Sequence, residues 1–154
     1  MAAAATSDPA LEACQNRTVS PVDVAGQAVP AAQVVLMEKQ VADYCNSGGS
    51  TEETRNRSRA AYSGHVSAYI TANPGDMRIS GYAAGLPNVG HEISCTYKKS
   101  GGSWMSCGHG VGQTFLSTST VKFCPVKGTS WTAIATVYRN GAAKISDSTT
   151  KFAV

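Results

Sequence analysis

The chain has 154 residues, of which 15% are charged and 42% are hydrophobic, and its formal net charge is +3. This length fits one domain, or one domain with a small extension. The low share of charged residues excludes a coiled coil, which is rich in Glu and Lys, and a charge-driven disordered chain. No apolar run reaches the roughly 18 residues that a membrane-spanning helix needs.

The basic side chains are concentrated in the later part of the chain. Residues 61–154 contain three acidic and eight basic side chains, and only Lys98 and Lys99 are adjacent. Such a small and scattered excess does not call for a nucleic-acid partner. We therefore expect no nucleic acid to bind. The basic side chains are interpreted as part of an ordinary mixed surface, and binding to an anionic surface is the alternative.

The first 29 residues are punctuated by Pro and Gly and show no sustained period, which predicts irregular structure. The opening letters, MAAAATSDPA, lack the basic and hydrophobic regions of a signal peptide. We interpret them as the start of a mature secreted chain, with the signal peptide removed and an initiator Met added.

Residues 31–46 are predicted to form a helix. Pro30 stands at a position where the first turn of a helix tolerates proline. Apolar side chains then recur at spacings of three and four, which predicts one buried stripe made of Val34, Met37, Val41, Tyr44 and Cys45. Gly48 and Gly49 end this helix, and a short second helix is expected from about residue 50 to Ala61.

From residue 62 onward the period of the hydrophobic side chains changes to two, which predicts β-strands. Turn signals occur at Asn73-Pro74-Gly75-Asp76, at Gly101 and at Asn140-Gly141. The expected strands lie near 65–71, 77–83, 91–98, 105–111, 112–117, 120–126, 130–138 and 143–153. Because no helix is predicted between them, the strands are expected to be antiparallel and to form a sandwich.

The last two strands, with the sequence SWTAIATVYRNGAAKISDSTTKFAV, resemble the closing hairpin of bacterial immunoglobulin-like or fibronectin-like domains. The Cys–Trp–Cys order of true immunoglobulin domains is absent, so the resemblance implies an architecture and no family. We therefore predict an α+β, mainly β chain. An N-terminal extension over 1–61, with one or two helices, precedes an antiparallel β-sandwich domain over 62–154.

Five cysteines are present and none lies in a CxxC pair, so zinc-ribbon and thioredoxin-like sites have no support. Together with the low charge, they favour an oxidising compartment and a secreted, extracellular protein. The preferred disulfides are Cys14–Cys45 and Cys95–Cys107, because a hairpin about Gly101 places Cys95 opposite Cys107. Cys124 is then unpaired. Rival pairings join Cys124 to Cys95 or Cys107, and reduced thiols are a further alternative.

His91 and His109 are the best candidates for a metal or catalytic site. In the same hairpin register they lie diagonally on one face of the sheet. Cys107 or His65 as a third ligand would complete a zinc site. However, no HExxH spacing exists and a disulfide would use Cys107. We therefore interpret the two as ordinary histidines at strand ends and predict no metal and no cofactor.

Patterns for other chemistry are weak. Glycoside hydrolysis needs paired carboxylates, and residues 61–154 offer only Asp76, Glu92 and Asp147. No GxSxG motif is present, and Cys124 as a nucleophile is the alternative to an unpaired buried thiol. The glycine-rich segment 107–113 has no helix after it that could hold a phosphate, so we interpret it as a bulged, flexible connection between strands.

Exposed aromatic and basic side chains are the candidates for binding. The alternation places Tyr69 and Tyr82 on the polar faces of their strands, and it places Trp104 opposite Lys98, away from Cys95. The predicted binding residues are Tyr69, Tyr82, Trp104, Lys98 and Arg78. The alternative is that the N-terminal helix covers this face and buries the rings.

These observations predict a secreted, non-catalytic module that binds a protein or glycan surface. A self-assembling extracellular structural subunit is the first alternative, because low charge, edge strands and an odd cysteine all permit association. A small secreted hydrolase or metal-binding protein that uses His91 and His109 is the second.

Overall fold

The computed structural model describes residues 12–46 and 62–154, and the helix expected at 50–61 lies outside these residues. Helix α2 has the predicted bounds, and no helix of the described part is long and apolar enough to cross a bilayer. The elements are α2 (Ala31–Asn46), β1 (His65–Asn73), β2 (Asp76–Ala84), β3 (His91–Lys99), β4 (Met105–Gly112), β5 (Leu116–Ser117), β6 (Val121–Phe123), β7 (Ser130–Arg139) and β8 (Ala142–Phe152).

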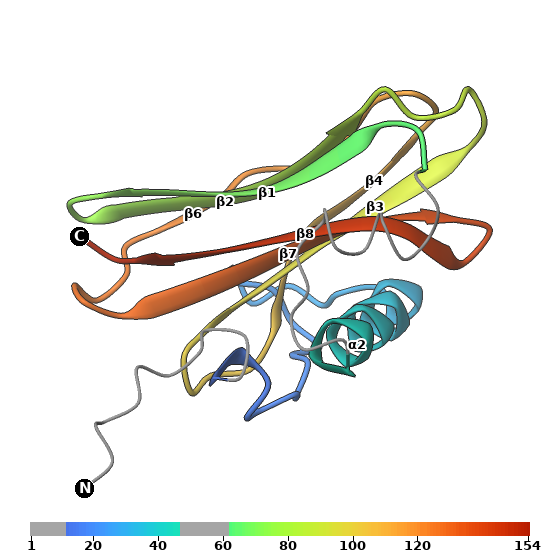
Figure 1. The fold of residues 1–154 in the computed structure, drawn as a ribbon. Coiled ribbons are helices and arrows are strands. Elements are labelled where there is room, and N and C mark those ends of the chain that lie inside the picture. The colour runs from blue at the N-terminus through green and yellow to red at the C-terminus, as the bar shows by residue number, and fades with distance from the viewer. Residues whose placement is uncertain (1–11, 47–61) are drawn as a thin grey trace, which may run out of the picture.

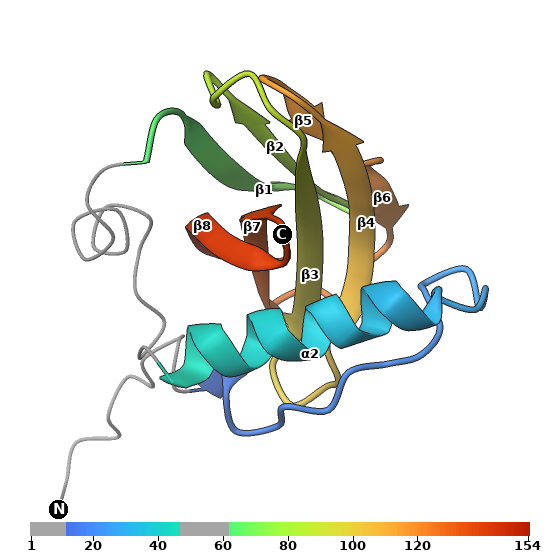
Figure 2. The ribbon, with the colours of Figure 1, turned by 90° about the vertical axis from the view of Figure 1, so that its right-hand side faces the viewer.

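The strands form two antiparallel sheets that face each other (Figure 1). The first sheet has the order β1-β2-β5, with β6 also paired to β2, and the second has the order β4-β3-β7-β8. Helix α2 lies across β3 on the outer side of the second sheet (Figure 2). The mainly β, α+β class and the antiparallel sandwich are confirmed. The immunoglobulin-like or fibronectin-like assignment and the boundary between residues 61 and 62 stay predictions.

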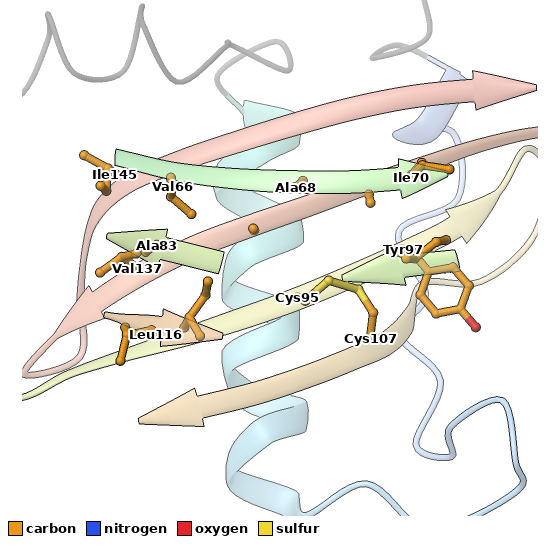
Figure 3. Packing of buried hydrophobic residues seen from close by; sticks show 14 of the residues in the cluster. Val66, Ala68, Ile70, Ala83, Cys95, Tyr97, Cys107, Leu116, Val137 and Ile145 are labelled. Atoms are coloured by element: carbon orange, nitrogen blue, oxygen red, sulfur yellow. A yellow bond between two sulfur atoms is a disulfide. The ribbon is translucent and has the colours of Figure 1, made fainter. Parts of the chain in front are cut away.

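One apolar cluster fills the space between the two sheets (Figure 3). In β1 and β2 nearly every second side chain is buried, as the alternation predicts. The side chains that β1 and β2 contribute to the apolar cluster are Val66, Ala68, Ile70, Met77, Ile79 and Ala83. The opposite sheet contributes the Cys95–Cys107 disulfide and the ring of Tyr97 to the same cluster.

The burial of β3 and β7 does not follow the alternation. Both strands bury most residues on both faces, because α2 and the segment before it cover the outer face of the second sheet. The covered side chains on this outer face are mostly small and polar: Ser94, Thr96, Ser106, Thr132, Thr136 and Ser146. Alternating polarity therefore predicts which way a side chain points, and does not show whether that face reaches solvent.

Gln40 connects α2 to this polar face. Its side chain is buried, and Nε2 donates hydrogen bonds to the Ser94 carbonyl oxygen at 3.1 Å and to Thr136 Oγ1 at 2.9 Å. Its Oε1 accepts a hydrogen bond from the Thr96 hydroxyl. Three apolar side chains complete the buried side of the helix: Met37, Val41 and Tyr44. A polar residue thus occupies the centre of the stripe that the spacing predicts.

Both predicted disulfides are present. Cys14–Cys45 spans 31 residues and ties the segment before α2 to the last turn of the helix. Cys95–Cys107 joins β3 to β4, with its Cα atoms 4.9 Å apart. One bridge therefore holds the N-terminal cover together, and the other lies in the core of the sandwich.

The register of the β3–β4 hairpin differs by one residue from the predicted one. Cys95 lies opposite Gly108, whereas Thr96 lies opposite Ser106, so Cys107 is the extra residue of a β-bulge. Counting outward from Gly101 cannot reveal a bulge. The prediction that Cys95 directly faces Cys107 is therefore wrong, although the disulfide forms.

The glycine-rich segment belongs to β4 and is not a connection between strands. A Cβ atom on Gly110 would lie 2.4 Å from the Ser117 carbonyl oxygen, and one on Gly112 would lie 2.8 Å from that of Phe115. The glycines therefore permit the backbone around β5 to pass close to β4, and this close approach joins the two sheets at that edge.

Candidate binding face

The outer face of the first sheet carries two stacked tyrosines. Tyr69 on β1 lies opposite Ser80, and Tyr82 on β2 lies opposite Ser67, so the two rings are diagonal neighbours. Their centroids are 5.3 Å apart, their planes differ by 6°, and their hydroxyl oxygens are 3.4 Å apart. Tyr69 is 49% exposed. This face points away from the side of the molecule that α2 covers (Figure 2).

Two further rings extend the pair. Phe115, 59% exposed, lies with its ring centroid 6.5 Å from that of Tyr82. His65 meets Tyr82 edge-on, with centroids 5.8 Å apart. We call these four residues, His65, Tyr69, Tyr82 and Phe115, the aromatic face. Phe115 is not among the predicted binding residues, and the strand expected near 112–117 is reduced to Leu116–Ser117, so Phe115 lies just before β5.

Basic side chains lie beside the aromatic face. Arg78 on β2 is paired with Thr71 on one side and with Lys122 of β6 on the other. The Arg78 guanidinium is bound to Asp76, with Nε 3.1 Å from Oδ2. Three predicted binding residues, Tyr69, Tyr82 and Arg78, therefore lie on the same face of one sheet.

The hydrogen bond between the two tyrosines affects the acidity of Tyr69. It raises the pKa of the Tyr69 phenol above its ordinary value, and the nearby Tyr82 and Asp147 charges and burial act in the same direction. The Tyr69 phenol therefore remains a neutral donor and acceptor at physiological pH.

Trp104 and Lys98 are not exposed, which corrects the prediction that they belong to a binding surface. Trp104 is completely buried, with its ring centroid 6.0 Å from that of Tyr44 on α2. The Lys98 ammonium lies over the Trp104 ring and donates hydrogen bonds to the carbonyl oxygens of Ala13 and Asn16. Burial lowers the pKa of Lys98. The alternative, that the N-terminal helix covers this face, holds for these two residues.

His91 and His109 do not share a face, because the bulge shifts the register between them. His91 points inward, where Tyr62 Oη lies 2.5 Å from its Nε2 and the Val89 carbonyl oxygen lies 2.7 Å from its Nδ1. Since a carbonyl only accepts, Nδ1 donates and Nε2 accepts from the tyrosine. His109 lies on the other side of the strand pair.

The three carboxylates of the sandwich each contact a different partner. Asp76 binds Arg78 and Glu92 binds His109 Nε2 at 2.8 Å, whereas Asp147 accepts a hydrogen bond from a backbone amide of β1. Across residues 12–46 and 62–154, no three His, Cys, Asp or Glu side chains gather in a way that could hold a metal ion.

A groove of about 370 Å³ lies between β4 and the segment that leads into α2. Its lining includes Ser106, His109 and Asp23, the residue types of a serine hydrolase. Ser106 Oγ, however, accepts hydrogen bonds from Gln33 Nε2 at 2.7 Å and from the Gly108 amide at 3.1 Å. Since His109 binds Glu92 on the outer side, no serine–histidine contact forms there.

Cys124 is an exposed free thiol, and it follows directly after β6. It belongs to neither disulfide, so the rival pairings with Cys95 and Cys107 do not occur. Its exposure corrects the interpretation of an unpaired buried thiol.

No family model and no curated protein matches this chain. Among solved structures, it is similar to R. palustris CsgH, with 10% identity, a TM-score of 0.39, and coverage of 55% of this chain and 89% of that one. It is similar to the E. coli curli protein CsgC, with 11% identity, a TM-score of 0.34, and coverage of 57% and 97%. A putative β-galactosidase from Bacteroides fragilis has 12% identity and a TM-score of 0.35, over 56% of this chain and 15% of that one.

Proposed function

We propose that this chain is a secreted, non-catalytic binding module that recognises a protein surface through the aromatic face and Arg78. The single observation that carries the proposal is the stacked, exposed pair of Tyr69 and Tyr82 on the open side of the first sheet. The pair does not belong to the core between the sheets, so the packing of the sandwich does not account for it.

Tyrosine and arginine are the residue types that contribute most to protein interfaces, together with tryptophan. Tyr69 and Tyr82 are already ordered by contact with each other, and Tyr82 is also in contact with His65. Rings held in place before binding lose little conformational entropy when a partner covers them. The neighbouring Arg78 offers a planar donor for an acidic group of that partner.

A protein partner fits this geometry better than a glycan. A sugar ring packs on a free aromatic face, whereas Tyr69 and Tyr82 turn one face of each ring toward the other. The edges, the hydroxyls and the uncovered ring faces that remain available suit the mixed apolar and polar contacts of a protein interface. Binding to glycans alone in the experiment below would contradict the proposal.

Secretion is part of the same proposal. Two disulfides are typical of proteins that fold in an oxidising compartment, such as the cell exterior or the periplasm. A partner would then be met outside the cytoplasm, and the test uses surface and secreted molecules.

The test compares three forms of the protein on arrays of extracellular proteins and glycans: wild type, Tyr69→Ser/Tyr82→Ser, and Phe152→Ser. Phe152 is the matched control, because it is an exposed ring, 66% accessible, on the other sheet. The double variant should bind its protein partner about 30-fold more weakly, which corresponds to about 2 kcal/mol, and the control should bind normally. Unchanged binding by the double variant, or binding to glycans alone, would contradict the proposal.

Self-assembly is the second candidate function, and the exposed Cys124 thiol favours it. A bridge between two copies through Cys124 would make a dimer that reductant separates. Light scattering with and without reductant tests this candidate. A wild-type mass that equals that of Cys124→Ser at every concentration would exclude a dimer linked by Cys124.

A further inference from the structure

The contact between Tyr69 and Tyr82 is unusual among the tyrosines of this chain. All six tyrosines lie in the described residues, and the ring contacts there include a single tyrosine–tyrosine pair. Tyr44 packs on Trp104, Tyr62 on His91, and Tyr97 on Phe123 and Trp131. Tyr69 in this pair is also accessible to solvent, whereas Tyr97 and Tyr138 are fully buried.

We propose that Tyr69 and Tyr82 form a modification site at which one-electron oxidation joins the two rings into an intramolecular dityrosine. The ring planes differ by 6°, and the hydroxyl oxygens are 3.4 Å apart whereas the ring centroids are 5.3 Å apart, so the two rings converge toward their hydroxyl ends. The carbon atoms next to each hydroxyl, where phenoxyl radicals couple, are therefore adjacent as well. This inference does not depend on the proposed binding function.

The reaction needs an oxidant from outside the protein, namely hydrogen peroxide with a haem peroxidase. Each phenol loses one electron and one proton and becomes a phenoxyl radical. The two radicals couple through their ortho carbons, and each ring then regains its aromaticity as the ortho hydrogen moves to the oxygen. A carbon–carbon bond forms, two hydrogen atoms leave the protein, and hydrogen peroxide is reduced to two molecules of water.

The surroundings of the pair allow the coupling. Tyr69 is 49% exposed, so an oxidant has access to its ring and the ring can turn toward its neighbour. The two residues stand on adjacent, hydrogen-bonded strands, which keep them at one separation in every molecule. The product would link β1 to β2 covalently and pin the register of that hairpin.

The experiment treats the folded protein with peroxidase and hydrogen peroxide over a range of protein concentrations. Monomer is isolated, reduced and digested with trypsin. Cleavage after Arg59, Arg78 and Lys98 puts Tyr69 on peptide 60–78 and Tyr82 on peptide 79–98. We expect dityrosine fluorescence in the monomer at every concentration, and a joined peptide whose mass is the sum of the two less two hydrogen atoms.

Variants identify the residues that couple. Tyr69→Phe and Tyr82→Phe retain a ring and should each reduce the joined peptide to background. Tyr62→Phe and Tyr97→Phe are matched controls, because Tyr62 and Tyr97 lie on the same two tryptic peptides, and both should retain it. The proposal is overturned if the monomer yields no joined peptide, if Tyr69→Phe still yields it, or if dityrosine appears only in dimers.

Discussion

The Asp147 carboxylate of β8 accepts a hydrogen bond from the backbone amide of Ala68 in β1, at 2.9 Å. These two strands are the neighbouring edges of different sheets. An inward charge at such a place closes the side of the sandwich and discourages pairing with another chain. The bond therefore couples the stability of the sandwich to the ionisation of one carboxyl group.

Asp147→Asn should stabilise the protein at neutral pH. Burial raises the pKa of Asp147 in the folded state, although backbone hydrogen bonds partly oppose it. The folded state therefore holds a proton at pH values where the unfolded state has lost it, and stability falls as the pH rises through this window. Asparagine retains an acceptor oxygen for the Ala68 amide without the buried charge.

The measurement is the melting temperature of wild type and Asp147→Asn from about pH 3 to neutral pH. This range includes the ordinary aspartate pKa of about 3.9. The difference should vanish at the acid end. Asp147→Ala is the control that loses the hydrogen bond, and it should be less stable than Asp147→Asn by about 1 kcal/mol. An asparagine variant no more stable than wild type at neutral pH would contradict the argument.

Tyr97→Phe should make the protein more resistant to alkali. Burial raises the pKa of Tyr97 to about 12, with a smaller contribution from the charge of Asp23. In the unfolded chain a tyrosine ionises near pH 10, so the folded state retains its proton longer and loses stability as the pH rises between about 10 and 12. Urea unfolding across this range should show a shallower decline for Tyr97→Phe. Parallel declines would show that Tyr97 does not contribute.

Gln40→Leu should destabilise the protein by about 2 kcal/mol, because it leaves the buried Thr96 and Thr136 hydroxyls without the amide that they contact. Leucine is apolar and of similar size, so lost packing is not the cause. Glu38→Gln, at an exposed position on the same helix, is the control and should change stability by less than about 0.5 kcal/mol. Equal stability of both variants in urea unfolding would show that the network contributes nothing.

Gly110→Ala should cost about 1–3 kcal/mol, because the new methyl group would meet the Ser117 carbonyl oxygen, which belongs to the backbone. Gly90→Ala is the matched control. There the nearest atom is the end of the flexible Arg139 side chain, at 3.7 Å. If thermal unfolding gives the same melting temperature for both variants, then the close approach of β4 and β5 is not a constraint.

Local signals predicted most of the secondary structure. The helix over 31–46 follows from spacing, and the Asn140-Gly141 turn, with positive φ at both residues, follows from the backbone preferences of that pair. The two disulfides could be proposed because hairpin formation and cysteine number restrict the choices. These are properties of short stretches of chain, and they do not require knowledge of what lies above a sheet.

The features that could not be predicted depend on tertiary contacts. The bulge at Cys107 shifts the register by one residue, and this separates His91 from His109. Trp104 and Lys98 have the alternation of exposed residues but lie beneath the N-terminal segment. Of the candidate site, the two tyrosines and Arg78 were found because β1 and β2 are an ordinary hairpin with one open face.

The Lys98 ammonium has a consequence for anyone who shortens this protein. A chain that started at residue 62 would retain the cation and lose both carbonyl oxygens that accept its hydrogen bonds. Trp104 would lose its contact with Tyr44, and the apolar side chains of Trp104 and Ile134 would become exposed to solvent. Such a fragment would aggregate through this exposed apolar surface, so binding assays are best run on the intact polypeptide.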